Sequence, residues 1–387
     1  MPAINRLETL RFMCRCLGEP THWGSSPESL QREITAGRIN WQELVRVSSE
    51  DRFYLTIAVY EALTTKRLDQ TIPRDLMDYF EAIREFNATR NRKLIQQCLH
   101  LAKLLNSIGV EPVLIKGSGN IASGLYSDPA VRIMDDLDVL VPPDRVQDCN
   151  RLLLKTGYRR CPLPAPLPNH HHLDLLQPDE GVGLVELHST ISQVPSRCRY
   201  ESSDIYTYSE RLPDVAVAVR VPSLACRIII GIQHSLNSTS KSSFFLREHV
   251  LRDLYDVGLL MTSATQEDWD RLMQYTTNAG LEHPFRERLN LAKALFGARL
   301  DPRFVIPGSG RFSWWRYDLR FRFPRLGRID EVLAYVAGTF RCALSRTERG
   351  RLKRKDLLNP SWYWFHLRCT IQSFRHPTTQ YDKLIEP

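Results

Sequence analysis

Two aspartates one residue apart are the side chains of this sequence best suited to chemistry. Asp136 and Asp138 alternate with the apolar residues Leu137, Val139 and Val141. Because successive side chains of a strand point to opposite faces, this spacing predicts a strand with both carboxylates on one face and an apolar face toward a core. Adjacent carboxylates repel each other unless a cation lies between them, so the pattern predicts a metal site.

A glycine-serine pair precedes these aspartates. An apolar strand is predicted over 112–116, where it reaches Lys116, Gly117 and Ser118, and a helix is predicted over 118–126. The first backbone N–H groups of a helix have no partner within it and attract phosphate. Metal-binding carboxylates beside a phosphate-binding turn are typical of phosphoryl or nucleotidyl transfer.

A third carboxylate is expected because nucleotidyl transfer generally uses two metal ions. Glu186 is the best candidate, since it lies in an otherwise apolar strand predicted over 182–188, and His188 shares its face. A preceding strand at 172–177 and a turn between the two predict a hairpin that joins the same sheet. Asp174, on that first strand, is the competing candidate for the third acid.

The elements that must position these residues fall into four regions. We predict an N-terminal helical region at 1–108, a catalytic core at 109–221, a C-terminal helical domain at 222–300 and a basic, aromatic-rich region at 301–387. The strand–helix–strand–helix–hairpin order of the core predicts an α+β fold with a small mixed sheet flanked by helices. Within the first region, a long helix is expected to begin at Pro73.

Composition narrows the class of protein. The 387 residues carry a net charge of +8 and a pI near 9.0, which favours anionic partners such as nucleotides or nucleic acid. The nine cysteines are scattered and form no Cys-x-x-Cys pair, as in a protein with reduced thiols. No apolar run is long enough for a transmembrane segment, and no signal peptide is apparent. We therefore expect a cytoplasmic protein.

Three consecutive histidines follow a proline-rich loop at 161–168. Three adjacent side chains of a strand cannot all face one ion, so His170, His171 and His172 are better explained as a loop entering the hairpin than as a metal site. This loop and these histidines lie beside the predicted acids and are candidates for the lining of an acceptor pocket.

Two C-terminal segments each allow two interpretations. Arginines alternate with aromatic residues over 311–328, which suits nucleic-acid binding but also an element that packs its aromatics on the core and leaves its arginines in water. The second interpretation is favoured, and nucleic acid is not the favoured partner. In 251–260, Arg252 and Asp256 have the i, i+4 spacing of an ion pair. A structural role in a contact between helices is favoured over a role as the wall of a base pocket.

The motifs resemble those of the uncharacterised nucleotidyltransferase family, within the DNA polymerase β-like nucleotidyltransferase superfamily. The superfamily pattern of Gly-Ser, an acid-x-acid strand and a later third acid is matched in order. The narrower family pattern is matched by Lys116-Gly117, Leu125-Tyr126, Pro129, Arg132, Met134, Asp136, Asp138, Leu140-Val141 and Glu186-Leu187-His188. The likeness covers roughly residues 30–290. Asp135 departs from the pattern and leaves open which pair of acids binds metal.

The resemblance implies a Mg²⁺-dependent enzyme that moves an NMP from an NTP, with ATP the favoured donor, to a hydroxyl of a small molecule or of a peptide or protein. Asp136, Asp138 and Glu186 would be catalytic and hold two Mg²⁺ ions. Lys116, Gly117, Ser118 and Arg132 would bind the nucleotide. The alternatives are a metal-dependent phosphotransferase or phosphohydrolase, and a non-catalytic adaptor that binds peptide or nucleic acid on the same fold.

Overall fold

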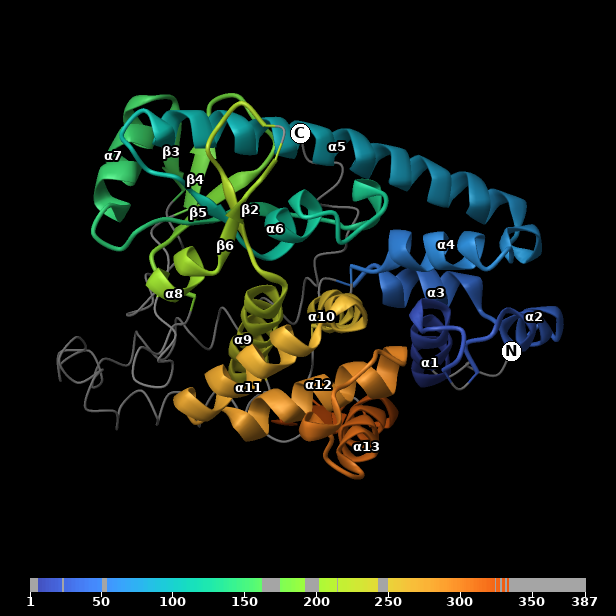
Figure 1. The fold of residues 1–387 in the computed structure, drawn as a ribbon. Coiled ribbons are helices and arrows are strands. Elements are labelled where there is room, and N and C mark those ends of the chain that lie inside the picture. Colours follow the sequence, from blue (N-terminus) through green and yellow to red (C-terminus); the bar gives the residue numbers. More distant parts are fainter. Residues whose placement is uncertain are drawn as a thin grey trace.

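A mixed β-sheet with helices around it forms the described part of the chain (Figure 1). The computed structural model describes residues 6–22, 24–50, 54–161, 175–191, 202–213, 215–242 and 250–323, with a few positions from 325 to 333. Structural statements below refer to these residues. The combination of a mixed sheet and many helices is consistent with the predicted α+β class.

The sheet contains seven strands among the described residues, in the order β3-β4-β5-β2-β1-β7-β6. Its strands are β1 (Val113–Leu114), β2 (Asp136–Leu140), β3 (Tyr158–Cys161), β4 (Leu175–Pro178), β5 (Leu184–His188), β6 (Ser209–Arg211) and β7 (Arg220–Pro222). The two central strands, β2 and β5, are parallel, whereas β4 and β5 are antiparallel and form the predicted hairpin. Leu137, Val139, Val185 and Leu187 are fully buried on the apolar side, as the alternation predicts.

Helices precede the sheet and connect its strands. The first five are α1 (Arg6–Leu17), α2 (Pro27–Thr35), α3 (Trp41–Ser48), α4 (Thr56–Thr65) and α5 (Arg74–Asn106). Within the sheet region lie α6 (Lys116–Ala122), the short 3-10 helix η2 (Pro129–Val131), α7 (Val146–Lys155) and α8 (Ser202–Thr207). The long α5 begins directly after Pro73, as predicted, and passes over the sheet toward α1–α4 (Figure 1).

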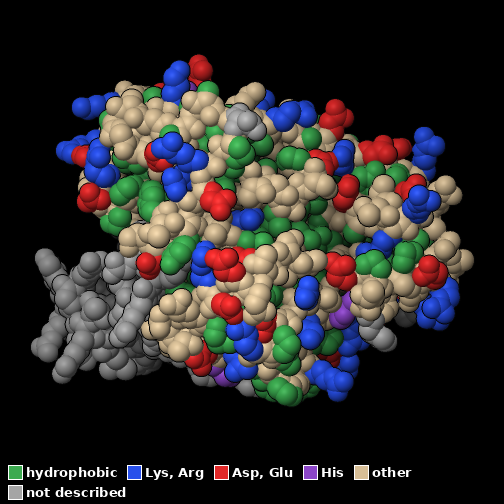
Figure 2. All heavy atoms as spheres, in the orientation of Figure 1, with side chains coloured by type: hydrophobic (Ala, Val, Ile, Leu, Met, Phe, Trp, Pro, Cys, Tyr) green, Lys and Arg blue, Asp and Glu red, His purple; other side chains and the backbone are tan. Residues whose placement is uncertain are grey.

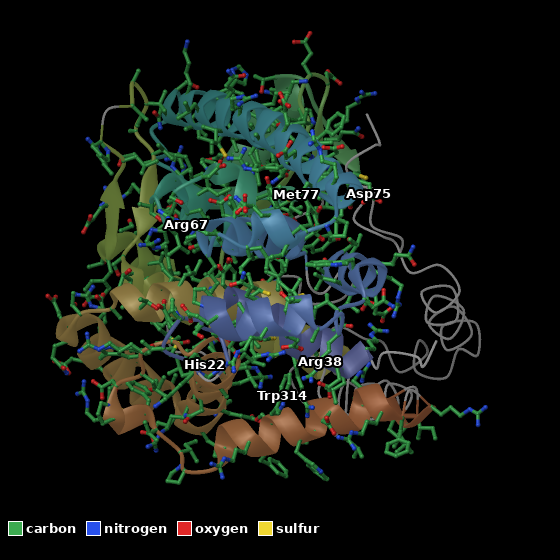
Figure 3. All side chains as sticks on the ribbon, turned by 90° about the vertical axis from the view of Figure 1, so that its right-hand side faces the viewer. His22, Arg38, Arg67, Asp75, Met77 and Trp314 are labelled. Atoms are coloured by element: carbon green, nitrogen blue, oxygen red, sulfur yellow. The ribbon has the colours of Figure 1, made fainter. Side chains whose placement is uncertain are left out.

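The C-terminal helices form a second layer below the sheet in Figure 1. They are α9 (Leu224–Ser242), α10 (Leu251–Ser263), α11 (Gln266–Ala279), α12 (Glu282–Phe296) and α13 (Ser309–Arg322). Helix α1 also contacts this layer, since it packs between α4 and α13 (Figure 3). Arg11 of α1 lies 3.1 Å from Asp318 and over the Trp314 ring, while His22 bonds to the Ala294 carbonyl.

Helix α13 departs from the prediction at two of its arginines. Arg316 and Arg320 are buried, and Arg316 donates to Glu287 of α12 at 2.7 Å. Phe312 and Trp315 stack on each other with about half of each residue exposed. The expectation that the arginines of this segment lie in water is therefore wrong for Arg316 and Arg320, because a buried carboxylate draws Arg316 inward.

Positive charge is not concentrated on the face seen in Figure 2. There, described acidic and basic side chains are interspersed over both the sheet region and the helical layer. None of the described helices combines the length and the apolar character needed to cross a membrane.

Candidate active site

The sheet register brings the predicted acids together. In the parallel pair β2 and β5, Asp138 lies directly beside Glu186, so their side chains share one face. His188, two residues further on, places Nε2 2.7 Å from Asp138 Oδ1 and 3.3 Å from Glu186 Oε2. Ligand atoms of these three residues all lie within 4.8 Å of one another, which is a geometry able to hold a metal ion.

A lysine ammonium neutralises this cluster. Lys116 Nζ donates to Asp138 Oδ1 at 2.6 Å and lies 3.8 Å from Glu186 Oε2. Lys116 has a φ of 54°, a left-handed conformation that costs a non-glycine residue about 1–3 kcal/mol and occurs most often at functional sites. The ammonium thus compensates part of the negative charge of these two carboxylates.

Protonation differs sharply among the acids. Burial would raise the pKa of Asp138, but Lys116 and His188 outweigh it and hold that pKa well below its usual range. Burial and the neighbouring Asp138 raise the pKa of Asp136 to about 7. Burial and Lys116 would lower the pKa of His188, yet its bonds to Asp138 and Glu186 leave it raised. Asp138 therefore keeps its negative charge, while Asp136 gains a proton easily.

Asp136 is the first residue of β2 and Asp135 precedes it, and the two side chains have different surroundings. Asp136 is on the face of Asp138, and its carboxyl makes no hydrogen bond or ion pair with any residue that the structure describes. Asp135 lies 3.9 Å from Arg252 of α10. Of the acids Asp135, Asp136 and Asp138, the last two therefore have the orientation predicted for the metal-binding pair.

The glycine-serine pair lies inside the first turn of α6 rather than before it. The helix begins at Lys116, two residues earlier than predicted, and Ser118 donates its hydroxyl to the carbonyls of Ile115 and Asp138. A Cβ on Gly119 would come within 2.4 Å of the Leu114 carbonyl oxygen, so only glycine allows this close approach of α6 to β1. Ser118 thus fixes the helix against the acid strand.

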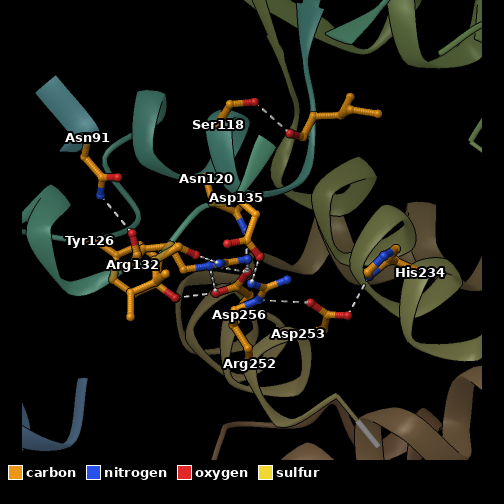
Figure 4. Close-up of polar contacts among 12 residues, drawn as sticks. Asn91, Ser118, Asn120, Tyr126, Arg132, Asp135, His234, Arg252, Asp253 and Asp256 are labelled. Atoms are coloured by element: carbon orange, nitrogen blue, oxygen red, sulfur yellow. Dashed lines mark hydrogen bonds and ion pairs between the residues drawn. The ribbon is translucent and has the colours of Figure 1, made fainter. Parts of the chain in front are cut away.

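Arg132 belongs to a buried network centred on Asp256. Its Nε and Nη2 contact the Asp256 carboxylate at 3.0 to 3.1 Å, and Tyr126 and Asn120 donate to the same group (Figure 4). The predicted pairing of Asp256 with Arg252 is wrong, because Asp256 faces the sheet side of α10. The Arg132 guanidinium is thus already bound to a carboxylate. A role for Arg132 in nucleotide binding stays a prediction.

Replacing Arg132 with methionine is expected to destabilise the fold. Breaking a buried ion pair leaves one charge uncompensated and costs about 3–5 kcal/mol. The double change Arg132→Met with Asp256→Leu should recover much of that loss in urea denaturation. If Arg132→Met kept wild-type stability and lost only ATP affinity, the nucleotide-binding role would be favoured instead.

Polar residues of α5 hold both acid strands, a role that was not predicted from the sequence. Asn87 and Asn91 donate to backbone carbonyls of the segment 129–132 that leads into β2. Gln97 bonds to the backbone of Val182 and Gly183, just before β5. All three are buried on the face of α5 that packs on the sheet. The sequence signal for these three residues is an amide side chain that recurs on the apolar face of the predicted helix.

Several predicted features lie outside the described residues. These are Asp174, the histidines at 170–172 and all but the first residue of the proline-rich loop. A pocket of about 480 Å³, lined in part by Glu111, Arg145 and Arg220, lies where β1 begins and β2 ends. None of the residues that line this pocket belongs to the acid cluster, so the pocket is separate from it.

The fold and the cluster define an α+β protein with a candidate metal site on its sheet. The chain belongs to the uncharacterised nucleotidyltransferase family, whose pattern matches residues 37–297. This match confirms the resemblance drawn from the motifs and supports assignment as a transferase that uses an NTP and a divalent metal. No curated protein matches the chain.

Proposed function

We propose that this protein is a Mg²⁺-dependent nucleotidyltransferase with a polymerase β-like core, which moves an NMP from an NTP, with ATP favoured, to a hydroxyl acceptor. The observation that carries the proposal is the register of Asp138 beside Glu186, with the Lys116 ammonium against both carboxylates. Family membership supplies the reaction class.

The donor atoms fit a divalent cation. Carboxylate oxygens are the ligands that Mg²⁺ prefers, and Asp136, Asp138 and Glu186 supply them from one face of two adjacent strands. His188 is fully buried and bonds to both Asp138 and Glu186, so we assign it to orienting those carboxylates. Bound there, two ions would neutralise the phosphates and lower the pKa of the acceptor hydroxyl.

The chain's own groups position the reaction. The first turn of α6 presents backbone N–H groups beside the acids, and Lys116 adds a positive charge there. The acceptor oxygen would attack the α-phosphorus in line, and the bond from that phosphorus to the bridging oxygen would break, so that pyrophosphate leaves with the electron pair. Catalysis then rests on orientation and charge neutralisation more than on covalent chemistry.

Labelled nucleotides test the reaction class. We expect protein incubated with Mg²⁺, α-labelled ATP and fractionated cell extract to transfer label to a small-molecule or peptide fraction, while γ-labelled ATP transfers none. Transfer of the γ-label would instead identify a phosphotransferase. Label found only in RNA would contradict the proposed acceptor class, and label in no fraction would favour the non-catalytic adaptor.

A further inference from the structure

Large apolar side chains are exposed together in one segment of the chain, at and after α13. Six of the nine large hydrophobic residues that are exposed in the described part of the chain lie between 312 and 333, and each is 44% to 55% exposed. These six residues, called the apolar patch below, are Phe312, Trp315, Phe323, Leu326, Ile329 and Leu333. Single exposed apolar residues are normal on a protein surface, whereas a group of them marks an interaction site.

Helix α13 places its aromatic residues outward and two of its arginines inward. Arg316 and Arg320 are buried, while Phe312 and Trp315, at i and i+3, lie on the exposed side of the helix. A helix side that faces water ordinarily carries polar residues, so this inversion indicates that the outward side of α13 meets an apolar surface. The helix lies at the lower edge of the molecule in two perpendicular views, where a broad surface can reach it (Figure 1 and Figure 3).

Exposed arginines accompany the apolar patch. Arg311, Arg322 and Arg325 are exposed, whereas the acids described in this segment are withdrawn, since Asp318 pairs with Arg322 and Asp330 is buried. Residues 301–387 hold 17 lysines and arginines against 8 aspartates and glutamates, a net charge of +9. Because the whole chain carries +8, the first 300 residues carry −1. The positive charge of the chain therefore belongs to the region that bears the apolar patch.

We propose that the apolar patch and its arginines bind the surface of an anionic lipid bilayer. The apolar side chains would enter the boundary between headgroups and acyl chains, and the arginines would contact lipid phosphates. The long stem of an arginine lies along apolar surface while its guanidinium stays at the polar level, so both kinds of residue fit one interface. This inference does not depend on the proposed nucleotidyl transfer.

Two other occupants fit the patch less well. Single-stranded nucleic acid stacks its bases on aromatic rings, but Leu326, Ile329 and Leu333 have none. The rings of Phe312 and Trp315 stack on each other, with centroids 5.7 Å apart, so part of each ring face is already covered. A second copy of the chain would bring the same positive region against itself, and like charges repel.

Flotation of the full chain with lipid vesicles tests the proposal. We expect wild type to float with vesicles that mix phosphatidylcholine and anionic phosphatidylglycerol, to stay behind with phosphatidylcholine alone, and to dissociate as salt is added. Phe312→Ser combined with Trp315→Ser should weaken binding by about 10- to 100-fold, the scale of burying two half-exposed aromatic side chains. Arg311→Gln combined with Arg325→Gln should weaken it by about 10-fold, the scale of two basic residues at an anionic surface.

Phe86→Ser combined with Arg92→Gln is the matched control. Both residues are exposed on α5, and Phe86 is 67% exposed. Helix α5 lies at the upper edge of the molecule in Figure 1, opposite α13. We expect this variant to bind vesicles as wild type does.

The contrary outcomes are distinct. Wild type that floats with neither kind of vesicle, or equally with both, would overturn the proposal without any variant. Flotation of the aromatic variant equal to that of wild type would remove the apolar patch from the interface. Retention of single-stranded RNA through these residues, without vesicle binding, would assign the surface to nucleic acid instead. A dimer that the aromatic variant dissociates in analytical ultracentrifugation, again without vesicle binding, would assign it to a second copy.

Discussion

Asp138→Asn is expected to reduce nucleotidyl transfer by about 10³-fold or more, the scale of losing one preorganised charged contact in a transition state. Asp138 is the residue where the contacts of Lys116, His188 and the neighbouring Glu186 converge. An amide at this position keeps the shape and loses the charge that a metal ion requires. Mn²⁺ titration followed by electron paramagnetic resonance should show the loss of metal binding independently of any acceptor.

Asp179→Asn is the matched control for this change. Asp179 is exposed in the turn after β4, where it pairs with Arg159. We expect it to keep wild-type metal binding and transfer. Full activity in Asp138→Asn, or equal losses in both variants, would contradict the proposed mechanism.

The expected effect of Asp138→Asn on stability differs between the sequence and the structure. Two neighbouring aspartates predict mutual repulsion, so removing one charge would leave the fold equally stable or more stable. In the structure, however, Asp138 is 4% exposed and pairs with Lys116 and His188. We therefore expect Asp138→Asn to lose about 1–3 kcal/mol of unfolding free energy, because Lys116 keeps its charge and loses its closest partner.

The sequence was sufficient for features that depend on local pattern. Alternation around Asp136 and Asp138 predicted the central strand, and the turn before Glu186 predicted the hairpin that places it in the same sheet. The apolar neighbours of Glu186 favoured it as the third acid, and that role stays a prediction. These signals are short-range, since strand periodicity and turn residues are readable within a few positions.

Contacts between distant segments could not be predicted in the same way. Arg132 and Asp256 are far apart in the sequence, and the charged residue nearest to Asp256 at helical spacing was Arg252. Local spacing therefore suggested the wrong partner. Arg316 was misassigned for a similar reason, because nothing near it in the sequence indicates the buried Glu287 that it meets. A helical pattern shows that two faces exist, but the partner helix decides which face is buried.

The two aspartates of β2 have opposite roles in the balance of charge. Asp138 is compensated by Lys116 and His188, whereas Asp136 has no described partner and is next to Asp138. The pKa of Asp136 rises to about 7 because burial and Asp138 oppose its ionisation. Ionised Asp136 therefore destabilises the metal-free protein. Such a cost is expected for a side chain arranged to bind a cation.

Asp136→Asn is accordingly expected to stabilise the protein in EDTA at pH 8. Near pH 4 the carboxyl is largely protonated in the folded protein, so variant and wild type should differ little there. Between pH 4 and 7 the unfolded chain ionises while the folded protein retains the proton, so wild type loses stability relative to the variant, and the difference is constant above pH 7. A shift of about three pKa units at about 1.4 kcal/mol each sets an upper limit near 4 kcal/mol, and partial exposure reduces our expectation to about 2 kcal/mol.

Urea denaturation at pH 4.5, 6 and 8, in EDTA and then in Mg²⁺, measures this effect. Saturating Mg²⁺ should stabilise wild type more than Asp136→Asn, because a ligand stabilises the folded state that binds it more tightly. The advantage of the variant at pH 8 should therefore shrink or reverse when the metal is added. A variant less stable than wild type in EDTA at pH 8 would show that Asp136 is compensated in the fold, and an advantage that Mg²⁺ leaves unchanged would remove Asp136 from the metal site.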